Sequence, residues 1–172
     1  MEIFKPSVYQ KTIFDIDYHS LRKNGIRCIV FDLDNTLGLI SDGKCPDKTK
    51  KLIHKLQNHF IIVISSNNTK KRLAPYLEEL GIDGVAWSLK PSIRGLAIIQ
   101  KKYQLKKKEM CIIGDQIVTD ILAGNRFHIK TILVDPLGEK DLKITSLNRK
   151  VEKFIVKRYQ KKGIFERGSY YE

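Results

Sequence analysis

The sequence predicts an α/β fold: a central parallel sheet of about five strands with helices on both of its faces. Short, nearly continuous apolar runs alternate along the chain with longer segments of helical periodicity. Continuous apolar runs are typical of strands buried on both faces, and their alternation with helices is the pattern of βαβ units. We expect strands at 28–33, 60–65, 84–88, 110–114 and 130–134.

Helix-like segments lie between these runs. Apolar residues recur in them at helical spacing, and two boundary signals support them. Gly81 follows the second segment and suits the left-handed position after a helix end. Pro91 suits the first turn of the third segment. We expect helices over 47–58, 69–80, 91–104 and 117–127.

The two ends of the chain differ from this alternating part. Residues 1–27 resemble an extended arm with one helical turn near Tyr18–Lys23, and residues 146–163 predict one more helix, rich in basic residues. A length of 172 residues fits one domain with a sizeable core. We therefore expect residues 1–172 to form a single domain.

The composition is that of an ordinary globular protein with a strongly basic balance. The formal net charge is +13, which favours anionic partners such as phosphate esters, nucleic acid or an acidic membrane surface. A genome-wide bias toward lysine would produce the same excess. The three cysteines form no motif, and the run at 60–64 is too short to span a bilayer. We expect a cytoplasmic protein with reduced thiols.

Polar side chains follow four of the predicted strands at the point where each strand ends. In an open parallel sheet these carboxyl ends form the edge at which ligands bind. The first strand ends in Asp32 and Asp34, the second in "SSNN" at 65–68, and the third is followed by Lys90. The fourth ends in "GDQIVTD", which contains Asp115 and Asp120.

Four carboxylates gathered at one edge would repel one another and raise one another's pKa values. The arrangement is favourable only if a cation lies among them. Because the donors are all oxygen atoms, a hard ion is expected, and Mg²⁺ also binds substrate phosphate. The pattern therefore predicts a magnesium site.

These segments resemble the four motifs of haloacid dehalogenase (HAD) superfamily phosphatases, in the same order and each at a strand end. More narrowly, the chain is similar to the YqeG-type class IIIA phosphatases, whose eukaryotic relatives are mitochondrial phosphatidylglycerophosphate phosphatases. The resemblance implies a HAD-type, Rossmann-like three-layer sandwich. It rests on Asp32–Thr36, Ser66–Asn67, Lys90–Pro91, Gly114–Asp120 and the ending "NRKVEKFIVKRYQKKG".

The resemblance assigns catalytic roles to four residues. Asp32 is the nucleophile that forms an aspartyl-phosphate, and Asp34 protonates the leaving oxygen and then deprotonates the attacking water. Lys90 offsets the negative charge of Asp32 and the phosphate. Ser66 binds phosphoryl oxygens, with the adjacent Ser65 as an alternative.

The resemblance also implies a binding role for Asn67, whose backbone N–H would hold a phosphoryl oxygen. The Mg²⁺ ligands it implies are Asp32, the backbone carbonyl of Asp34, and Asp115. Asp120 would complete the site, either as a direct ligand or through water.

Many HAD phosphatases carry a cap domain over the active site, and this chain has no room for one. About a dozen residues, 35–46, separate the first motif from the next helix, and the connection around Lys90 is shorter still. We therefore expect a capless, open site. An open site suits a large phosphorylated substrate: a lipid head group, a protein or a nucleic-acid end.

The predicted C-terminal helix is amphipathic. Such a helix can lie on an anionic membrane or pack its apolar face on the domain, and the two are compatible. Its apolar residues Val151, Phe154, Ile155 and Tyr159 fall on one face. Around them lie Arg149, Lys150, Lys153, Lys157, Arg158, Lys161 and Lys162.

The sequence thus predicts a Mg²⁺-dependent phosphomonoesterase, with a lipid phosphate such as phosphatidylglycerophosphate as its substrate. A peripheral contact with the inner face of an anionic membrane through residues 146–163 would fit that substrate. The alternatives are a phosphatase of nucleic-acid ends or phosphoproteins, and a non-catalytic RNA- or ribosome-associated HAD module. The pattern specifies no oligomeric state.

Overall fold

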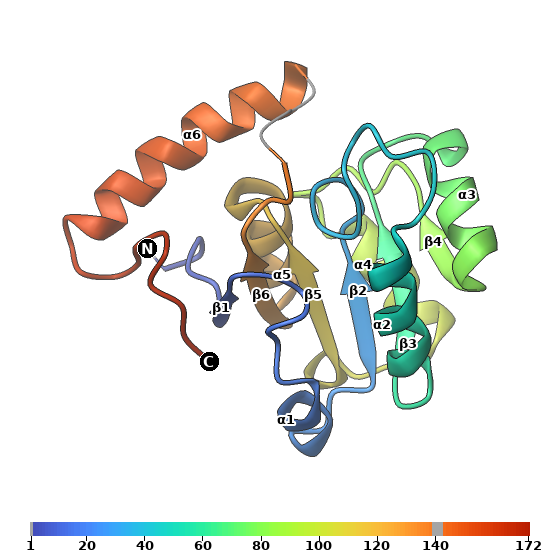
Figure 1. Ribbon diagram of the computed structural model, residues 1–172. Helices are drawn as coiled ribbons and strands as arrows, with labels where there is room; N and C mark the ends of the chain where they lie inside the picture. Colours follow the sequence, from blue (N-terminus) through green and yellow to red (C-terminus); the bar gives the residue numbers. More distant parts are fainter. Residues whose placement is uncertain (1, 139–142) are drawn as a thin grey trace.

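The computed structural model describes residues 2–138 and 143–172 and contains a six-stranded parallel sheet (Figure 1). The strands lie in the order β1-β6-β5-β2-β3-β4. They are β1 (Val8–Gln10), β2 (Cys28–Phe31), β3 (Ile61–Ser65), β4 (Asp83–Val85), β5 (Met110–Gly114) and β6 (Lys130–Val134). The helices are α1 (Tyr18–Lys23), α2 (Asp47–Gln57), α3 (Lys70–Leu80), α4 (Arg94–Lys102), α5 (Leu122–Phe127) and α6 (Lys143–Gln160).

Helices cover both faces of the sheet, as predicted, and β2 shows how. Ile29 and Phe31 belong to a core that includes apolar residues of α2 and α3, whereas Cys28 and Val30 belong to a second core with residues of α4 and α5. Successive side chains of a strand point to opposite faces, so a strand with both sets buried lies between two layers. The predicted three-layer α/β fold is confirmed.

The sixth strand, β1, lies within the segment predicted as an extended arm. Val8 pairs with Ile132 of β6, and Tyr9 is fully buried and exchanges backbone hydrogen bonds with Tyr171. A three-residue edge strand is too short to show a period in the sequence, which is why the estimate of about five strands omitted it. The single helical turn predicted at Tyr18–Lys23 is confirmed as α1.

Two other boundaries differ from prediction around Lys90. The strand expected at 84–88 is β4, which ends at Val85, because Trp87 adopts a positive φ of 51° that an extended strand cannot contain. The helix expected from Pro91 begins only at Arg94. The residues between form a loop that carries Lys90 to the edge of the sheet.

The helix predicted at 117–127 has two parts. Ile117–Ile121 form a π-helical turn, and α5 follows from Leu122. The wider turn lies directly after β5. π-Helical turns occur frequently at functional sites.

The C-terminal helix α6 begins and ends three residues before its predicted bounds of 146–163. Only part of the predicted apolar face packs on the domain. Tyr159 is buried in a cluster with Tyr9, and Ile155 packs against that cluster, while Val151 and Phe154 are 47% and 68% exposed. None of the helices in the described part of the chain could cross a membrane.

The connections that carry caps in many related enzymes are short here. Between β2 and α2, and between β4 and α4, the described residues form no further helix or multi-residue strand. The prediction of a capless fold is therefore confirmed for both connections. The carboxyl ends of the strands are left without a covering domain (Figure 1).

Candidate active site

Three of the predicted carboxylates meet at the carboxyl edge of the sheet. Asp32 follows β2, Asp115 follows β5, and Asp120 lies in the π-helical turn. Each offers an oxygen atom within 4.8 Å of the others, and all three residues are buried. Because β2 and β5 are neighbouring parallel strands, their ends necessarily lie side by side.

Lys90 brings a positive charge into this cluster. Its Nζ donates to Asp32 Oδ1 at 2.6 Å, to Asp120 Oδ1 at 2.6 Å, and to the backbone carbonyl of Ser65 at 2.7 Å. Its side chain is only 3% exposed. The amine thus contacts both sides of the acidic cluster, as the role assigned to it requires.

Asn67 fixes the backbone on which Lys90 sits. Its side-chain Oδ1 accepts from the Lys90 N–H at 2.7 Å, and its Nδ2 donates to the Lys90 carbonyl at 2.9 Å. The hydroxyl of Ser88 also donates to this amide oxygen at 3.0 Å. The side chain of Asn67 therefore positions Lys90, a role that the sequence did not suggest.

The electrostatics of the cluster favour an added cation. Burial raises the pKa of Asp32 to about 7, although Lys90 pulls it down, and Asp120 adds to the increase. Burial likewise raises the pKa of Asp115, against the opposing effect of Arg149. The pKa of Lys90 is raised despite its burial, because Asp120 and Asp32 outweigh that effect. The lysine alone thus leaves the ionised carboxylates of Asp32 and Asp115 disfavoured.

The donor set fits a hard metal ion. Asp115 Oδ1 is buried and, among the described residues, accepts no hydrogen bond. A buried oxygen without a partner is costly, and a cation next to three carboxylates would satisfy it. The residues could therefore hold Mg²⁺ or a similar ion.

Asp34 lies beside the cluster and is held by different partners. Arg72 of α3 donates to Asp34 Oδ1 from Nε at 3.0 Å and from Nη2 at 2.8 Å, and Asn68 donates to Oδ2 at 3.2 Å. Arg72 also donates to the carbonyls of Leu39 and Asp42 and so fastens the β2–α2 loop. Arg72 was missed from the sequence because it lies in a run of basic residues.

The two serines at the carboxyl end of β3 face different ways. The Ser65 Oγ would lie 3.2 Å from a Cβ atom built on Gly95 of α4, so it points toward that helix. The Ser66 Oγ accepts from the Asn68 N–H at 3.1 Å, within the turn at the carboxyl edge. This placement favours Ser66 over Ser65 as the hydroxyl near a substrate.

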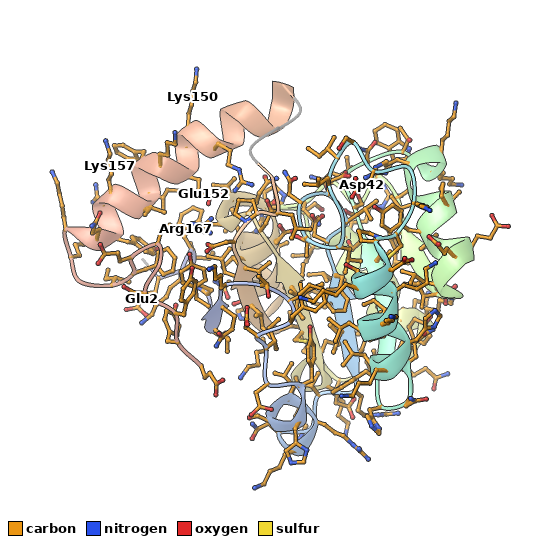
Figure 2. All side chains as sticks on the ribbon, in the orientation of Figure 1. Glu2, Asp42, Lys150, Glu152, Lys157 and Arg167 are labelled. Atoms are coloured by element: carbon orange, nitrogen blue, oxygen red, sulfur yellow. The ribbon has the colours of Figure 1, made fainter. Side chains whose placement is uncertain are left out.

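The C-terminal helix also reaches the cluster, which the sequence interpretation did not anticipate. Arg149 of α6, expected among the basic residues around an apolar face, forms an ion pair with Asp115 Oδ2 and donates to the Asp115 carbonyl at 3.2 Å. Arg167 donates to that same carbonyl at 3.2 Å, and Glu152 pairs with both arginines. Figure 2 shows Glu152 and Arg167 between α6 and the sheet.

Comparison with known proteins identifies the family of this chain. The sequence profile of the mitochondrial PGP phosphatase family matches residues 1–138. This chain belongs to that family. It is 36% identical over 166 residues to "Probable phosphatase YqeG" of Bacillus subtilis (strain 168), covering 94% of this chain and 95% of that protein.

A more distant relative extends the family to plants. "Phosphatidylglycerophosphate phosphatase 1, chloroplastic/mitochondrial" of Arabidopsis thaliana is 28% identical over 170 residues, which are 92% of this chain and 49% of the plant protein. Our chain thus spans about half the length of that relative. A crystal structure of an uncharacterized protein from Listeria monocytogenes serotype 4b shares the fold, with a TM-score of 0.55 at 19% identity over 68% of this chain and 85% of that one.

The family and the acidic cluster together establish the general activity. As a member of the mitochondrial PGP phosphatase family, the protein is a hydrolase that removes phosphate groups. The predicted resemblance and the predicted enzyme class are both confirmed.

Proposed function

We propose that the protein is a Mg²⁺-dependent phosphomonoesterase that acts through an aspartyl-phosphate on Asp32, with a lipid phosphate such as phosphatidylglycerophosphate as substrate. The observation that carries the proposal is the buried contact of Lys90 with Asp32 and Asp120, beside the unpartnered oxygen of Asp115. With Mg²⁺ bound, this arrangement would have the charges needed to receive a phosphate dianion next to a carboxylate nucleophile.

The reaction has two steps. A carboxylate oxygen of Asp32 attacks phosphorus as the bond from phosphorus to the ester oxygen breaks, and Asp34 gives that oxygen a proton. Water then attacks the phosphorus of the aspartyl-phosphate, Asp34 takes a proton from the water, and phosphate leaves with Asp32 restored. Arg72 and Asn68 hold the Asp34 carboxyl in place for both transfers.

The remaining groups stabilise charge on the transferring phosphoryl group. Lys90 is already in contact with Asp32, and Ser66 with the backbone N–H of Asn67 would hold phosphoryl oxygens. Asp32, Asp115 and the backbone carbonyl of Asp34 would hold Mg²⁺, and Asp120 would support it through its contact with Lys90. Bound Mg²⁺ supplies positive charge that favours the ionised form of Asp32 and neutralises the phosphate.

Three observations support a lipid substrate. The relatives in plants are named for phosphatidylglycerophosphate. The carboxyl edge carries no cap in the described residues, so a head group attached to a membrane could reach it. The net charge of +13 favours an anionic surface.

The outer face of α6 supports a peripheral contact with the inner, cytoplasmic face of an anionic membrane, as expected for residues 146–163. Phe154 is 68% exposed, and Lys150, Lys157 and Lys161 are exposed one or two helical turns from it. Figure 2 shows Lys150 pointing away from the sheet. An apolar residue among lysines suits the boundary between head groups and water.

Phosphate release tests the proposal, measured with Mg²⁺ and with chelator for the wild type and Asp32→Asn. The substrates are an aryl phosphate and phosphatidylglycerophosphate in anionic micelles. We expect Mg²⁺-dependent release that is much faster from the lipid and absent in Asp32→Asn. Release from the aryl ester alone would reject the lipid substrate, and release that persists in Asp32→Asn would reject the aspartyl-phosphate mechanism.

A further inference from the structure

Exposed apolar side chains gather in the loops around the catalytic edge. Among the described residues, ten large hydrophobic side chains are exposed, and five of them follow the carboxyl ends of strands. The two most exposed of these five, Trp87 at 56% and Leu89 at 55%, flank Ser88 in the loop that delivers Lys90. The others are Leu39 after β2, Ile93 after β4 and Leu137 after β6.

The backbone holds Trp87 and Leu89 outward in an unusual conformation. Their φ angles are 51° and 55°, in the left-handed region that bulky residues rarely adopt. The N–H of Trp87 donates to the Asn68 carbonyl at 3.1 Å, and the N–H of Ser88 donates to the Ser66 carbonyl at 3.0 Å. Ser88 is buried and faces inward, whereas its two neighbours are exposed.

Glycine or asparagine would adopt these φ angles with less strain. The need to bury Lys90 explains the backbone conformation, but it does not explain large apolar side chains at the two outward positions. Local strain of this kind is found at functional sites. Trp87 and Leu89 thus combine strain with exposure directly beside the catalytic lysine.

The same edge carries several exposed basic residues. Four exposed basic residues lie in the loops and first helical turns that follow the strands, and a fifth, Arg126 in the last turn of α5, donates to the Pro91 carbonyl at 3.1 Å. Tryptophan prefers the boundary between lipid and water, where lysine and arginine can reach head groups. The exposed basic residues of this edge are Lys44, Lys70, Lys71, Arg94 and Arg126.

We propose that this edge docks on the surface of an anionic lipid bilayer, with Trp87 and Leu89 inserted among the head groups. The inference rests on the lipid substrate of the proposed function. It identifies the surface of the protein that would contact the membrane containing that substrate. Docking in this way would bring phosphate groups of the bilayer to Lys90 and Asp32 without extracting the lipid.

Trp87 is the single tryptophan of the chain and reports on this contact directly. Its fluorescence is measured during titration with vesicles of phosphatidylglycerol and phosphatidylcholine, and with vesicles of phosphatidylcholine alone. We expect a blue shift with the anionic vesicles that high salt weakens. No shift with anionic vesicles, or an equal shift with neutral ones, would overturn the proposal.

Leu89→Asn separates docking from folding, because asparagine tolerates a positive φ and the variant keeps Trp87 as reporter. We expect roughly tenfold weaker vesicle binding, with release from a soluble aryl phosphate unchanged. Ile98→Asn on α4, which is 46% exposed in the wild type, is the matched control and should bind as the wild type does.

A loss of binding in Phe154→Asn but not in Leu89→Asn would assign docking to α6 and overturn the role of the edge. Since vesicle binding is measured without turnover, failure of the docking proposal is distinguishable from failure of the phosphatase proposal.

A second inference comes from the independent contact of α6 with Asp115. Arg149 pairs with Asp115 Oδ2, while Oδ1 accepts no hydrogen bond from the described residues. Glu152 is 4% exposed and joins Arg149 to Arg167, and it also accepts from the Ile117 N–H at 3.1 Å. One carboxylate oxygen of Asp115 is thus held by Arg149, and the other is buried without a hydrogen-bond partner among the described residues.

We infer that Arg149 is a positioning residue that orients Asp115 toward the metal assumed in the proposed function. Groups that hold a ligating carboxylate typically affect metal affinity by roughly 10- to 100-fold. We expect Arg149→Gln to bind Mn²⁺ at least about tenfold more weakly in calorimetry, with Arg149→Lys recovering part of the loss.

Lys153→Gln, an exposed change on the same helix, is the matched control and should leave Mn²⁺ binding unchanged. Unaltered or tighter Mn²⁺ binding in a folded Arg149→Gln would overturn the inference. If the wild type itself bound no Mn²⁺, the metal in the proposed function would fail instead.

Discussion

Replacing Asp32 by asparagine should make the metal-free protein more stable than the wild type at pH 8, although it abolishes the proposed nucleophile. Burial raises the pKa of Asp32 from 3.8 to about 7 in the folded protein. At pH values between 3.8 and about 7, Asp32 keeps its proton in the folded state and has lost it in the unfolded chain. The wild type therefore loses stability as the pH rises from about 4 through 7, and asparagine has no such proton to lose.

The magnitude follows from the size of this difference. At about 1.4 kcal/mol per pKa unit, the interval from 3.8 to about 7 corresponds to about 4 kcal/mol of unfolding free energy. The Asp32 side chain is only 12% exposed, so solvent screens little of this effect. Because Asp32 also raises the pKa values of Asp115 and Lys90, the difference in stability between the two proteins reports on the whole acidic cluster.

Urea unfolding at pH 4 to 8 in the presence of chelator measures the effect. Between pH 4 and pH 8, the unfolding free energy of Asp32→Asn should rise relative to that of the wild type by up to about 4 kcal/mol. Asp47→Asn, at a side chain that is 90% exposed, is the control and should follow the wild type at every pH. Parallel profiles for Asp32→Asn and wild type would refute the reasoning.

Three further substitutions test other parts of the site. Lys90→Gln leaves buried carboxylates without their cation and should cost about 3–5 kcal/mol in urea unfolding. A Cβ at Gly114 would lie 2.3 Å from Asp120 Cγ and would displace that side chain, so Gly114→Ala should lower phosphate release about 100-fold. Gly43→Ala is the control: no atom lies within 4 Å of its Cβ, and its phosphate release should not fall. Arg72→Met releases the proposed general acid and should lower kcat for an aryl phosphate by about 100-fold with little change in KM.

Each of these outcomes can fail on its own. Wild-type stability in Lys90→Gln would mean that the carboxylates are protonated without the lysine. Equal activities of the two glycine variants would mean that Asp120 can shift without harm. A changed KM with an unchanged kcat in Arg72→Met would place Arg72 in substrate binding instead of acid catalysis.

The positions of the acidic residues were predictable because topology alone decides them. Asp32 and Asp115 end two apolar runs, and parallel strands bring such ends to one edge whatever the details of packing. Lys90 was predictable for the same reason, although its strand and helix boundaries were not. The conformation of its loop depends on Asn67 and on positive φ angles, which leave no periodic signal in the sequence.

The arginines around the site could not be predicted in the same way. Arg72 and Arg149 each lie next to other basic residues, so nothing local distinguishes a residue that forms a buried ion pair from one that faces water. The selection is made by tertiary contacts: α3 turns Arg72 toward Asp34, and α6 turns Arg149 toward Asp115. The division of the apolar residues of α6 between Tyr159 and Phe154 has the same origin.

The contact between α6 and Asp115 bears on where this enzyme can be shortened. The family profile ends at residue 138. The residues that pair with Asp115 or support its ion pair, Arg149, Glu152 and Arg167, all lie after it. A truncation at the profile boundary would keep every motif residue and still remove Arg149, Glu152 and Arg167. Such a shortened chain would retain the four motifs while losing the support of a proposed metal ligand, so the proposed metal site depends on residues beyond those that the family profile matches.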